Sequence, residues 1–325
     1  MASLMRSLND ISLISFVSPA HNEANSLSPF LSELIDSIEK LNLPCAYEIV
    51  VVDDGSMDDT PDILASWVES YPDVMRVVRL TRNFGFCAAS TAALYYSKGD
   101  IVILMDADMQ DDPAIFPSFL EKWIEGYDVV YAVRMKRQES TIVKALTWIF
   151  YRMLRLTSPI SLPLDAGTYA LMDRKVVNAI EKLPERNRYI PGLRSWSGYR
   201  QIGIPVQRRQ RIHGRSRMGL RKLFDLAMMA FFTFSYTPLF FFRLLAICGL
   251  GIAFLLILAC PAFLFLGHMN WQSVLMLLMV AFFSSVNLLG IVLLSEYVAL
   301  VYDEVRNRPL YLVDRIIENQ SLEHR

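Results

Sequence analysis

The sequence predicts an α/β domain with a mostly parallel β-sheet, followed by an interface helix and a two-helix transmembrane hairpin. Three observations support this prediction. Apolar, β-branched segments alternate with helical segments over the first 134 residues, polar clusters follow three of these segments, and a long stretch near the C-terminus carries no charge. Alternation of strands and helices is typical of parallel sheets with helices on their faces.

Five short segments are expected as strands and four intervening segments as helices. The expected strands are 12–18, 47–53, 74–80, 100–105 and 128–133, and the expected helices are 26–41, 60–70, 86–97 and 113–125. Their composition suits strands that are buried on both faces. In such sheets, ligands bind beyond the carboxyl ends of the strands.

The charge-free stretch runs from Leu244 to Ser295. A bilayer core of about 30 Å requires about 20 apolar residues in a helix, and two such runs are present, 244–267 and 274–295, with a turn at 268–272. The alternative is a buried hairpin of a soluble protein, but soluble helices seldom exceed about 20 residues without a charge. The mean hydropathy of +0.31 also favours a membrane segment.

Lys and Arg residues flank this stretch on both sides and are absent from the expected turn. The positive-inside rule predicts that both termini lie in the cytoplasm, and together with the two apolar runs this makes a multi-pass protein of the plasma membrane the expectation. Residues 220–238 suit a helix in the headgroup plane, or alternatively a helix that packs between domains. The expected organisation is a cytosolic α/β domain over 1–219, the interface helix, a membrane segment over 239–302 and a cytoplasmic tail over 303–325.

Composition excludes two classes of protein. The 32 Lys plus Arg and 33 Asp plus Glu give a formal charge of −1, whereas a nucleic-acid-binding protein carries a basic excess. The four cysteines stand singly, without metal-ligand spacing, and are expected to be reduced thiols rather than a disulfide framework.

Three polar clusters follow the first, second and fourth expected strands, at 19–23, 53–56 and 106–108. Asp106 and Asp108 lie two residues apart and could present oxygens to one hard cation, Mg²⁺ or Mn²⁺, whose open positions bind phosphate oxygens. Such a cation would neutralise charge on a departing diphosphate. The alternative for this pair is a solvated turn. Asp53 and Asp54 could bind a base or ribose, or form an Asx turn.

Taken together, these motifs resemble glycosyltransferase family 2, which has the nucleotide-diphospho-sugar-binding GT-A fold. The matching segments are PAHNE at 19–23, VDDGS at 52–56, RNFG at 82–85, DADMQD at 106–111 and YDVVYAVR at 127–134. The chain is most similar to polyisoprenyl-phosphate glycosyltransferases, such as bactoprenol glucosyltransferases and the aminoarabinose and dolichol-phosphate mannose enzymes. That similarity rests on LMDR at 171–174, LPERNR at 183–188, RIHGRSR at 211–217 and the segment 294–309, and covers residues 10 to 315.

The resemblance implies a role for each matching residue. The nucleotide pocket would be lined by residues of the first two motifs, and Arg82 of the third motif would lie near the diphosphate or be purely structural. Asp106 and Asp108 would meet the metal and the sugar diphosphate, and Gln110 would complete the metal shell. The residues implied in nucleotide binding are Pro19, His21, Glu23, Asp53, Asp54, Arg82 and Asp106.

Three arginines are implied in binding phosphate groups: Arg134 at the end of the fifth strand, and Arg211 and Arg217 in the basic segment 208–222. For the basic segment, the alternative is a stripe resting on anionic lipid, worth about 1 kcal/mol per charge. Both roles are expected, with Arg211 and Arg217 in the site and Arg221 and Lys222 against lipid.

The chain departs from the family where relatives have an Asp thought to orient the acceptor, because Thr168 stands there. Asp165 is the nearest carboxylate. A phosphate monoester has a second pKa near about 6, so a lipid monophosphate is mostly dianionic at cytosolic pH and needs no general base. It needs positioning and charge screening.

The expected function is inverting transfer of a sugar from UDP-glucose to undecaprenyl phosphate. GDP-mannose, UDP-N-acetylglucosamine and UDP-galactose remain alternative donors. A processive synthase would need more membrane spans and a QxxRW segment, which is absent. A non-catalytic membrane scaffold that binds sugar nucleotide is the alternative from another class. The resemblance also makes a homo-oligomer, such as a tetramer, reasonable.

Overall fold

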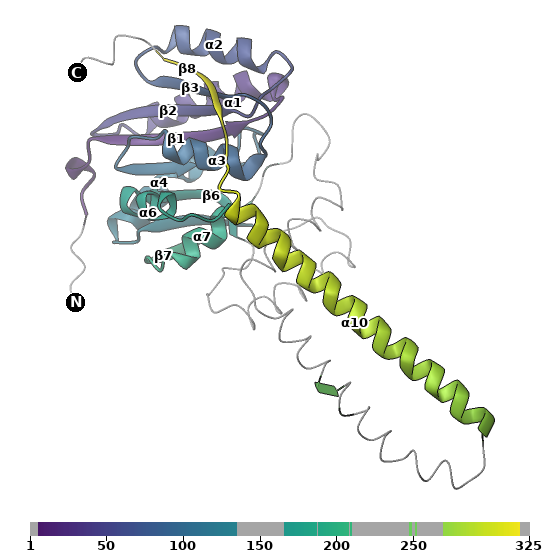
Figure 1. Ribbon diagram of the computed structural model, residues 1–325. Coiled ribbons are helices and arrows are strands. Elements are labelled where there is room, and N and C mark those ends of the chain that lie inside the picture. Colours follow the sequence, from purple (N-terminus) through teal and green to yellow (C-terminus); the bar gives the residue numbers. More distant parts are fainter. Residues whose placement is uncertain are drawn as a thin grey trace. The chain divides into compact units, whose positions relative to one another are not determined.

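The computed structural model describes residues 6–134, 166–186, 188–207, 209, 247–248, 251 and 269–318. The chain forms two compact units. The first comprises Met1–Arg155, Ile160–Asp225 and Arg308–Arg325, and the second Leu156–Pro159 and Leu226–Asn307. Figure 1 shows the sheet and helices of the first unit and the long helix α10 of the second.

The first unit is built on one eight-stranded sheet with the strand order β7-β5-β6-β4-β1-β2-β3-β8. Its centre, β4-β1-β2-β3, is parallel, while β6 runs antiparallel between β4 and β5. At the edges, β7 is parallel to β5 and β8 antiparallel to β3. The strands are β1 (Leu13–Ala20), β2 (Ala46–Asp53), β3 (Met75–Leu80), β4 (Ile101–Leu104), β5 (Val129–Arg134), β6 (Ala166–Asp173), β7 (Gln201–Val206) and β8 (Val313–Ile317).

Helices cover both faces of this sheet, and the expected strands and helices are confirmed with small shifts at their ends. A short 3-10 helix, η1 (Leu8–Asp10), precedes β1, and a second, η2 (Pro113–Ile115), leads directly into α4. The α-helices are α1 (Ala24–Lys40), α2 (Thr60–Ser70), α3 (Phe86–Tyr95), α4 (Phe116–Ile124), α6 (Arg174–Glu181) and α7 (Ile190–Trp196).

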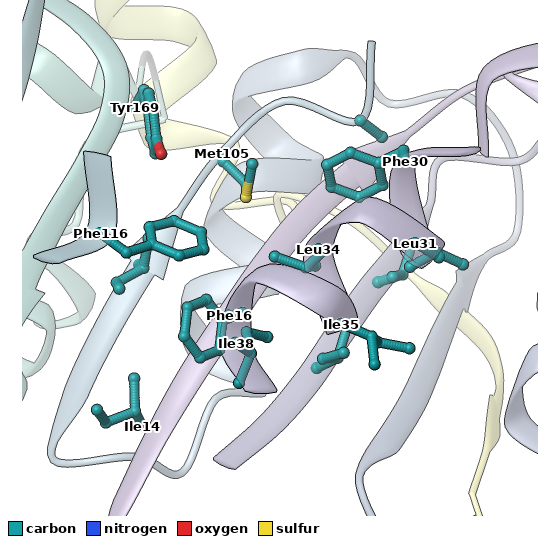
Figure 2. Close-up of a cluster of buried hydrophobic side chains, with 14 of the residues drawn as sticks. Ile14, Phe16, Phe30, Leu31, Leu34, Ile35, Ile38, Met105, Phe116 and Tyr169 are labelled. Atoms are coloured by element: carbon teal, nitrogen blue, oxygen red, sulfur yellow. The ribbon is translucent and has the colours of Figure 1, made fainter. Parts of the chain in front are cut away.

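The main core lies between the sheet and α1, α2 and α4. In α1 the buried residues recur at helical spacing, with Leu27, Leu31, Leu34 and Ile38 on the face that meets the sheet. The Phe16 ring of β1 lies 5.0 Å from the Phe116 ring of α4, measured between centroids. Figure 2 shows this cluster around Phe16. These contacts fix α1 and α4 beside the strand ends that carry the polar clusters.

Helix α3 packs on the opposite face through small residues. Ala89, Ser90, Ala92 and Ala93 are buried there. Small side chains allow the helix backbone to approach β1 and β2 closely. The packing of α3 therefore fixes the position of its first residue, Phe86, which directly follows the turn after β3.

The second unit contains α10, which runs from Met269 to Val305. Within it, Phe282–Val305 is, by length and composition alone, the one helical segment among the described residues that could cross a membrane. The expected turn at 268–272 is wrong for residues 269–272, which are helical because no Gly or Pro interrupts them. The interface helix at 220–238 and nearly all of the first expected span lie outside the described residues.

The expected tail over 303–325 contains secondary structure that the sequence did not predict. Residues up to Val305 belong to α10, and Val313–Ile317 forms β8 on the edge of the sheet. The Thr81 N–H donates to Leu312 O at 2.9 Å, and Arg76 bridges Glu48 and Glu318 at 2.8 and 3.0 Å. The chain therefore returns to the first unit after α10 and covers the otherwise open edge of β3.

We expect Phe116→Ala to lower the free energy of unfolding by about 3–5 kcal/mol, because it empties a fully buried position against Phe16. Urea unfolding of the purified chain measures this loss. Met57→Ala is the matched control, since that side chain is 96% exposed and should change stability by less than about 0.5 kcal/mol. Equal losses for the two variants would contradict the packing described for α4.

Candidate active site

The three polar clusters meet at one edge of the sheet. They follow β4, β1 and β2, which are neighbours and run parallel. The register pairs Ala20 with Asp53, so β1 and β2 end at the same level, and it pairs Val17 with Leu104, so β4 ends three residues before the end of β1. The carboxyl ends of adjacent parallel strands therefore bring the clusters together, as the sequence predicts.

The turn after β2 is held by its own carboxylates. Asp53, at the end of the strand, accepts a hydrogen bond from the Ser56 N–H at 2.9 Å and lies 3.5 Å from Arg79 Nε. Asp54 accepts from the N–H groups of Phe84 and Gly85 at 2.7 and 2.9 Å. Burial raises the pKa of Asp54 despite these bonds. Asp54 thus ties the turn after β2 to the turn after β3, and its described contacts are structural.

Residues 21–23 connect β1 to the same turn. The Asn22 N–H donates to Ser56 Oγ at 2.9 Å, and Asn22 Oδ1 accepts from the Met57 N–H at 2.8 Å. The Glu23 N–H donates to Thr60 Oγ1 at 2.9 Å. Asn22 has a φ of 51°, a left-handed conformation that Asn adopts more readily than most residues. Asn22 thus orients its neighbours His21 and Glu23, a role that spacing alone could not indicate.

Arg82 lies in the turn after β3 and is exposed. Its guanidinium stacks 4.0 Å from the centroid of the Phe84 ring, and Nη1 donates to Asn83 O at 2.9 Å. Next to it, Gly55 has a φ of 63°, and a Cβ there would lie 2.3 Å from the Arg82 carbonyl carbon. The backbone of the turn after β2 therefore lies directly against the backbone of the turn after β3.

The carboxylate loop, residues 106–112, follows β4 and folds back on itself. The Asp106 N–H donates to Asp111 Oδ2, and the Gln110 N–H donates to Asp108 Oδ1, both at 3.1 Å. Met109 takes a φ of 63° to allow this turn. Asp108 and Asp111 are buried and Asp106 is half-buried. The loop is therefore a preformed carboxylate turn rather than a solvated one.

The donor set of this loop fits a hard divalent cation. Within the described part of the chain, no group of three or more His, Cys, Asp or Glu side chains forms a complete metal site. Mg²⁺ is commonly held by only one or two carboxylates, with substrate phosphates and water as its other ligands. Asp106 and Asp108 suit such a site, which a diphosphate substrate would complete.

The other predicted site residues are placed only in part. Arg134 ends β5, where its backbone pairs with Val206. Thr168 lies in β6, next to Tyr169, whose hydroxyl donates to Asp112 O at 2.9 Å. The start of β6 therefore adjoins the carboxylate loop. Asp165, Arg211 and Arg217 lie outside the described residues.

Arg194 in α7 is a buried cation that the sequence does not single out. Its side chain is fully buried, its guanidinium lies 4.5 Å from the centroid of the Tyr131 ring, and burial lowers its pKa to about 10. It donates to Gly167 O at 3.5 Å. Arg194 thus remains charged at neutral pH beside the start of β6.

We expect Gly55→Ala to weaken UDP binding by about tenfold or more, because its Cβ would force apart the turns that Asp54 joins. Isothermal titration measures the affinity. Gly198→Ala is the matched control: Gly198 also has a positive φ, 74°, but a Cβ added there would meet no atom within 4 Å. That variant should lose about 1–2 kcal/mol of stability and keep its UDP affinity. Unchanged binding in Gly55→Ala would contradict a nucleotide pocket at these turns.

Comparison with known proteins agrees with this geometry. Residues 15–181 match the model of glycosyl transferase family 2. An uncharacterised glycosyltransferase of Synechocystis is 38% identical, over 92% of this chain and 94% of that protein. The undecaprenyl-phosphate 4-deoxy-4-formamido-L-arabinose transferase of Sodalis glossinidius is 33% identical, over 96% of each chain. The SfII prophage-derived bactoprenol glucosyl transferase of Shigella flexneri is also 33% identical, over 93% of this chain and 97% of that protein.

The family match covers the sheet from β1 to α6, including every polar cluster described above. The mixed sheet, with its parallel centre and the antiparallel β6 beside β4, is the GT-A architecture that the motifs predict. The chain is a glycosyltransferase, and it belongs to glycosyltransferase family 2.

Proposed function

We propose that this chain transfers glucose from UDP-glucose to undecaprenyl phosphate, with inversion at the anomeric carbon. One observation carries the proposal: the carboxylate loop after β4 lies at the same sheet edge as the Asp53 turn after β2. A sugar nucleotide needs both features, one for its diphosphate and one for its nucleoside. The relatives named for undecaprenyl phosphate and bactoprenol, which match over nearly their whole length, support a lipid phosphate as acceptor.

The donor half of the reaction is assigned to β1, β2 and β4. Asp53, His21 and Glu23 would contact the nucleoside, and Asp106 and Asp108 would hold Mg²⁺ or Mn²⁺. When bound, the metal supplies positive charge to the departing UDP. The Gln110 N–H fixes Asp108 Oδ1 at 3.1 Å, so that carboxylate is oriented before substrate arrives. Gln110 itself is proposed as a further metal ligand.

The acceptor half needs cations rather than a base. The lipid phosphate is mostly dianionic near neutral pH, since its second pKa is about 6, and its oxygen attacks the anomeric carbon as UDP leaves. Arg134, Arg211 and Arg217 would screen the repulsion between the two phosphate groups. Thr168 cannot accept a proton in this role, and Asp165 is proposed to orient the acceptor.

The apolar part of α10 supports a membrane location, which the proposed acceptor requires. Phe282–Val305 has the length and composition of a span, and a polyprenyl chain is confined to the bilayer. We propose a multi-pass plasma-membrane protein with a cytoplasmic catalytic unit, both termini in the cytoplasm, and assembly as a homo-oligomer.

The test is sugar transfer from radiolabelled UDP-glucose to undecaprenyl phosphate in detergent, with Mg²⁺, with Mn²⁺ and with chelator. Metal-dependent label in the lipid phase is the expected result. Parallel reactions with GDP-mannose, UDP-N-acetylglucosamine and UDP-galactose identify the donor. Binding of sugar nucleotide without transfer to any lipid phosphate would instead indicate a non-catalytic scaffold.

We expect Asp108→Asn to lower kcat by about 100-fold or more, because the variant loses a charged ligand at the position where leaving-group charge develops. The initial rate of lipid labelling at saturating donor measures it. Asp36→Asn, on the exposed face of α1, is the matched control and should retain full activity. An Asp108 variant as active as that control would refute the metal assignment.

Arg217→Ala should reduce the transfer rate far more than Arg221→Ala, because Arg217 is assigned to substrate phosphate and Arg221 to lipid headgroups. The two variants are compared in vesicles with and without anionic lipid. Loss of Arg221 should matter only when anionic lipid is present. Equal effects of both substitutions would mean that the basic segment contacts lipid alone.

A further inference from the structure

Arg209 makes contacts in the first unit that neither the motifs nor the proposed chemistry requires. Its backbone N–H donates to Gln110 O at 3.2 Å, and the Gln110 side-chain amide donates back to Arg209 O at 3.4 Å. Its guanidinium forms ion pairs with Glu33 of α1 through Nη1 and with Asp112 through Nη2, the latter at 2.7 Å. One residue is thus joined to the carboxylate loop and to a core helix.

Both carboxylates that receive Arg209 belong to parts of the domain that other contacts hold in place. Glu33 lies on α1, whose opposite face is buried in the main core. Asp112 Oδ1 also accepts from the Ala114 N–H at 2.9 Å, and Asp112 O accepts from the Tyr169 hydroxyl. The guanidinium is planar and forked, so it can hold two carboxylates at a set angle, which an ammonium group cannot do. Arg209 is therefore anchored to rigid parts of the domain.

The contact extends directly to the candidate metal site. Arg209 bonds to Gln110, and the Gln110 N–H bonds to Asp108 Oδ1. Met109, which lies between Asp108 and Gln110 in the sequence, takes a left-handed φ of 63°. Such a conformation persists only where neighbouring contacts maintain it. Holding Gln110 from outside the loop therefore holds the orientation of the Asp108 carboxylate.

We propose that Arg209 is a positioning residue that clamps the carboxylate loop to α1. It joins Glu33 to Asp112 and Gln110, and so keeps the Asp108 carboxylate in a fixed orientation. This inference rests on the proposed function, which assigns Asp108 to the metal.

The test uses the full-length chain in detergent and the variant Arg209→Met, which keeps the apolar stem and removes the fork. We expect kcat to fall by about 10- to 100-fold, since small displacements of reacting groups are costly. UDP affinity measured without metal should stay within about twofold, because the contacts of Asp53 and Asp54 involve none of these residues. Hydrogen exchange at residues 105–112 should become faster.

Lys122→Met is the matched control. Lys122 of α4 forms an ion pair with Glu125 at 2.5 Å, and its side chain is about as exposed as that of Arg209, but it lies outside the site. It should alter neither kcat nor exchange in the carboxylate loop. Glu33→Gln should shift kcat in the same direction as Arg209→Met but less, because the bond to Asp112 remains. The reversed pair Glu33→Arg with Arg209→Glu should recover part of the lost rate relative to Arg209→Glu alone.

Two results would overturn the proposal. Unchanged hydrogen exchange in Arg209→Met would mean that Arg209 does not hold the carboxylate loop. Faster exchange with an unchanged kcat would mean that Arg209 has a structural role only. A wild-type chain that transfers no sugar would overturn the proposed function instead. Hydrogen exchange at residues 105–112 in Arg209→Met would then show by itself whether Arg209 holds the carboxylate loop.

Discussion

The parallel register of β4, β1 and β2 determines where the chemistry of this chain is placed. Each strand is buried on both faces, and each ends where its sequence changes from β-branched apolar residues to Asp, Asn and Glu. Because the strands are adjacent and run parallel, three polar segments spread over residues 19–108 meet at the edge formed by their carboxyl ends. The helices of both faces fix that register through the core.

The site is rigid because its carboxylates are held by backbone N–H groups. Asp54 accepts two such bonds and Asp53 and Asp108 one each, and Asn22 links the segment after β1 to the turn after β2. Burying a carboxylate is costly unless hydrogen bonds compensate it. These bonds offset part of that cost and orient the remaining oxygens. A preformed arrangement of this kind suits electrostatic catalysis, in which groups must be aligned before charge develops.

The two substrates impose different demands on the two halves of the sheet. The turns after β1, β2 and β3 are joined to one another by hydrogen bonds, and this is the side proposed for the nucleoside. Beyond β4, the start of β6 adjoins the carboxylate loop through Tyr169, and Arg194 and Arg134 belong to the elements on that side. An acceptor that arrives as a dianion needs cations around it, and the residues assigned to that half are mainly arginines.

Local sequence patterns were enough to predict the first five strands, the four helices between them and the three polar clusters. Periodicity carries that information, because a strand buried on both faces needs a continuous apolar run. The same patterns did not predict β6, β7 or β8. The edge strands β7 and β8 are short and partly polar, and Gly167 and Thr168 weaken the strand pattern in β6.

Which side chains meet one another depended on the tertiary structure. The Arg209–Glu33 pair joins residues 176 positions apart, and Asp54 meets Phe84 and Gly85 across 30 and 31 positions. No local pattern encodes such contacts, since they depend on how strands are ordered and where loops return. The chemical character of the site can therefore be predicted from its motifs, while its geometry arises from the sheet that brings those motifs together.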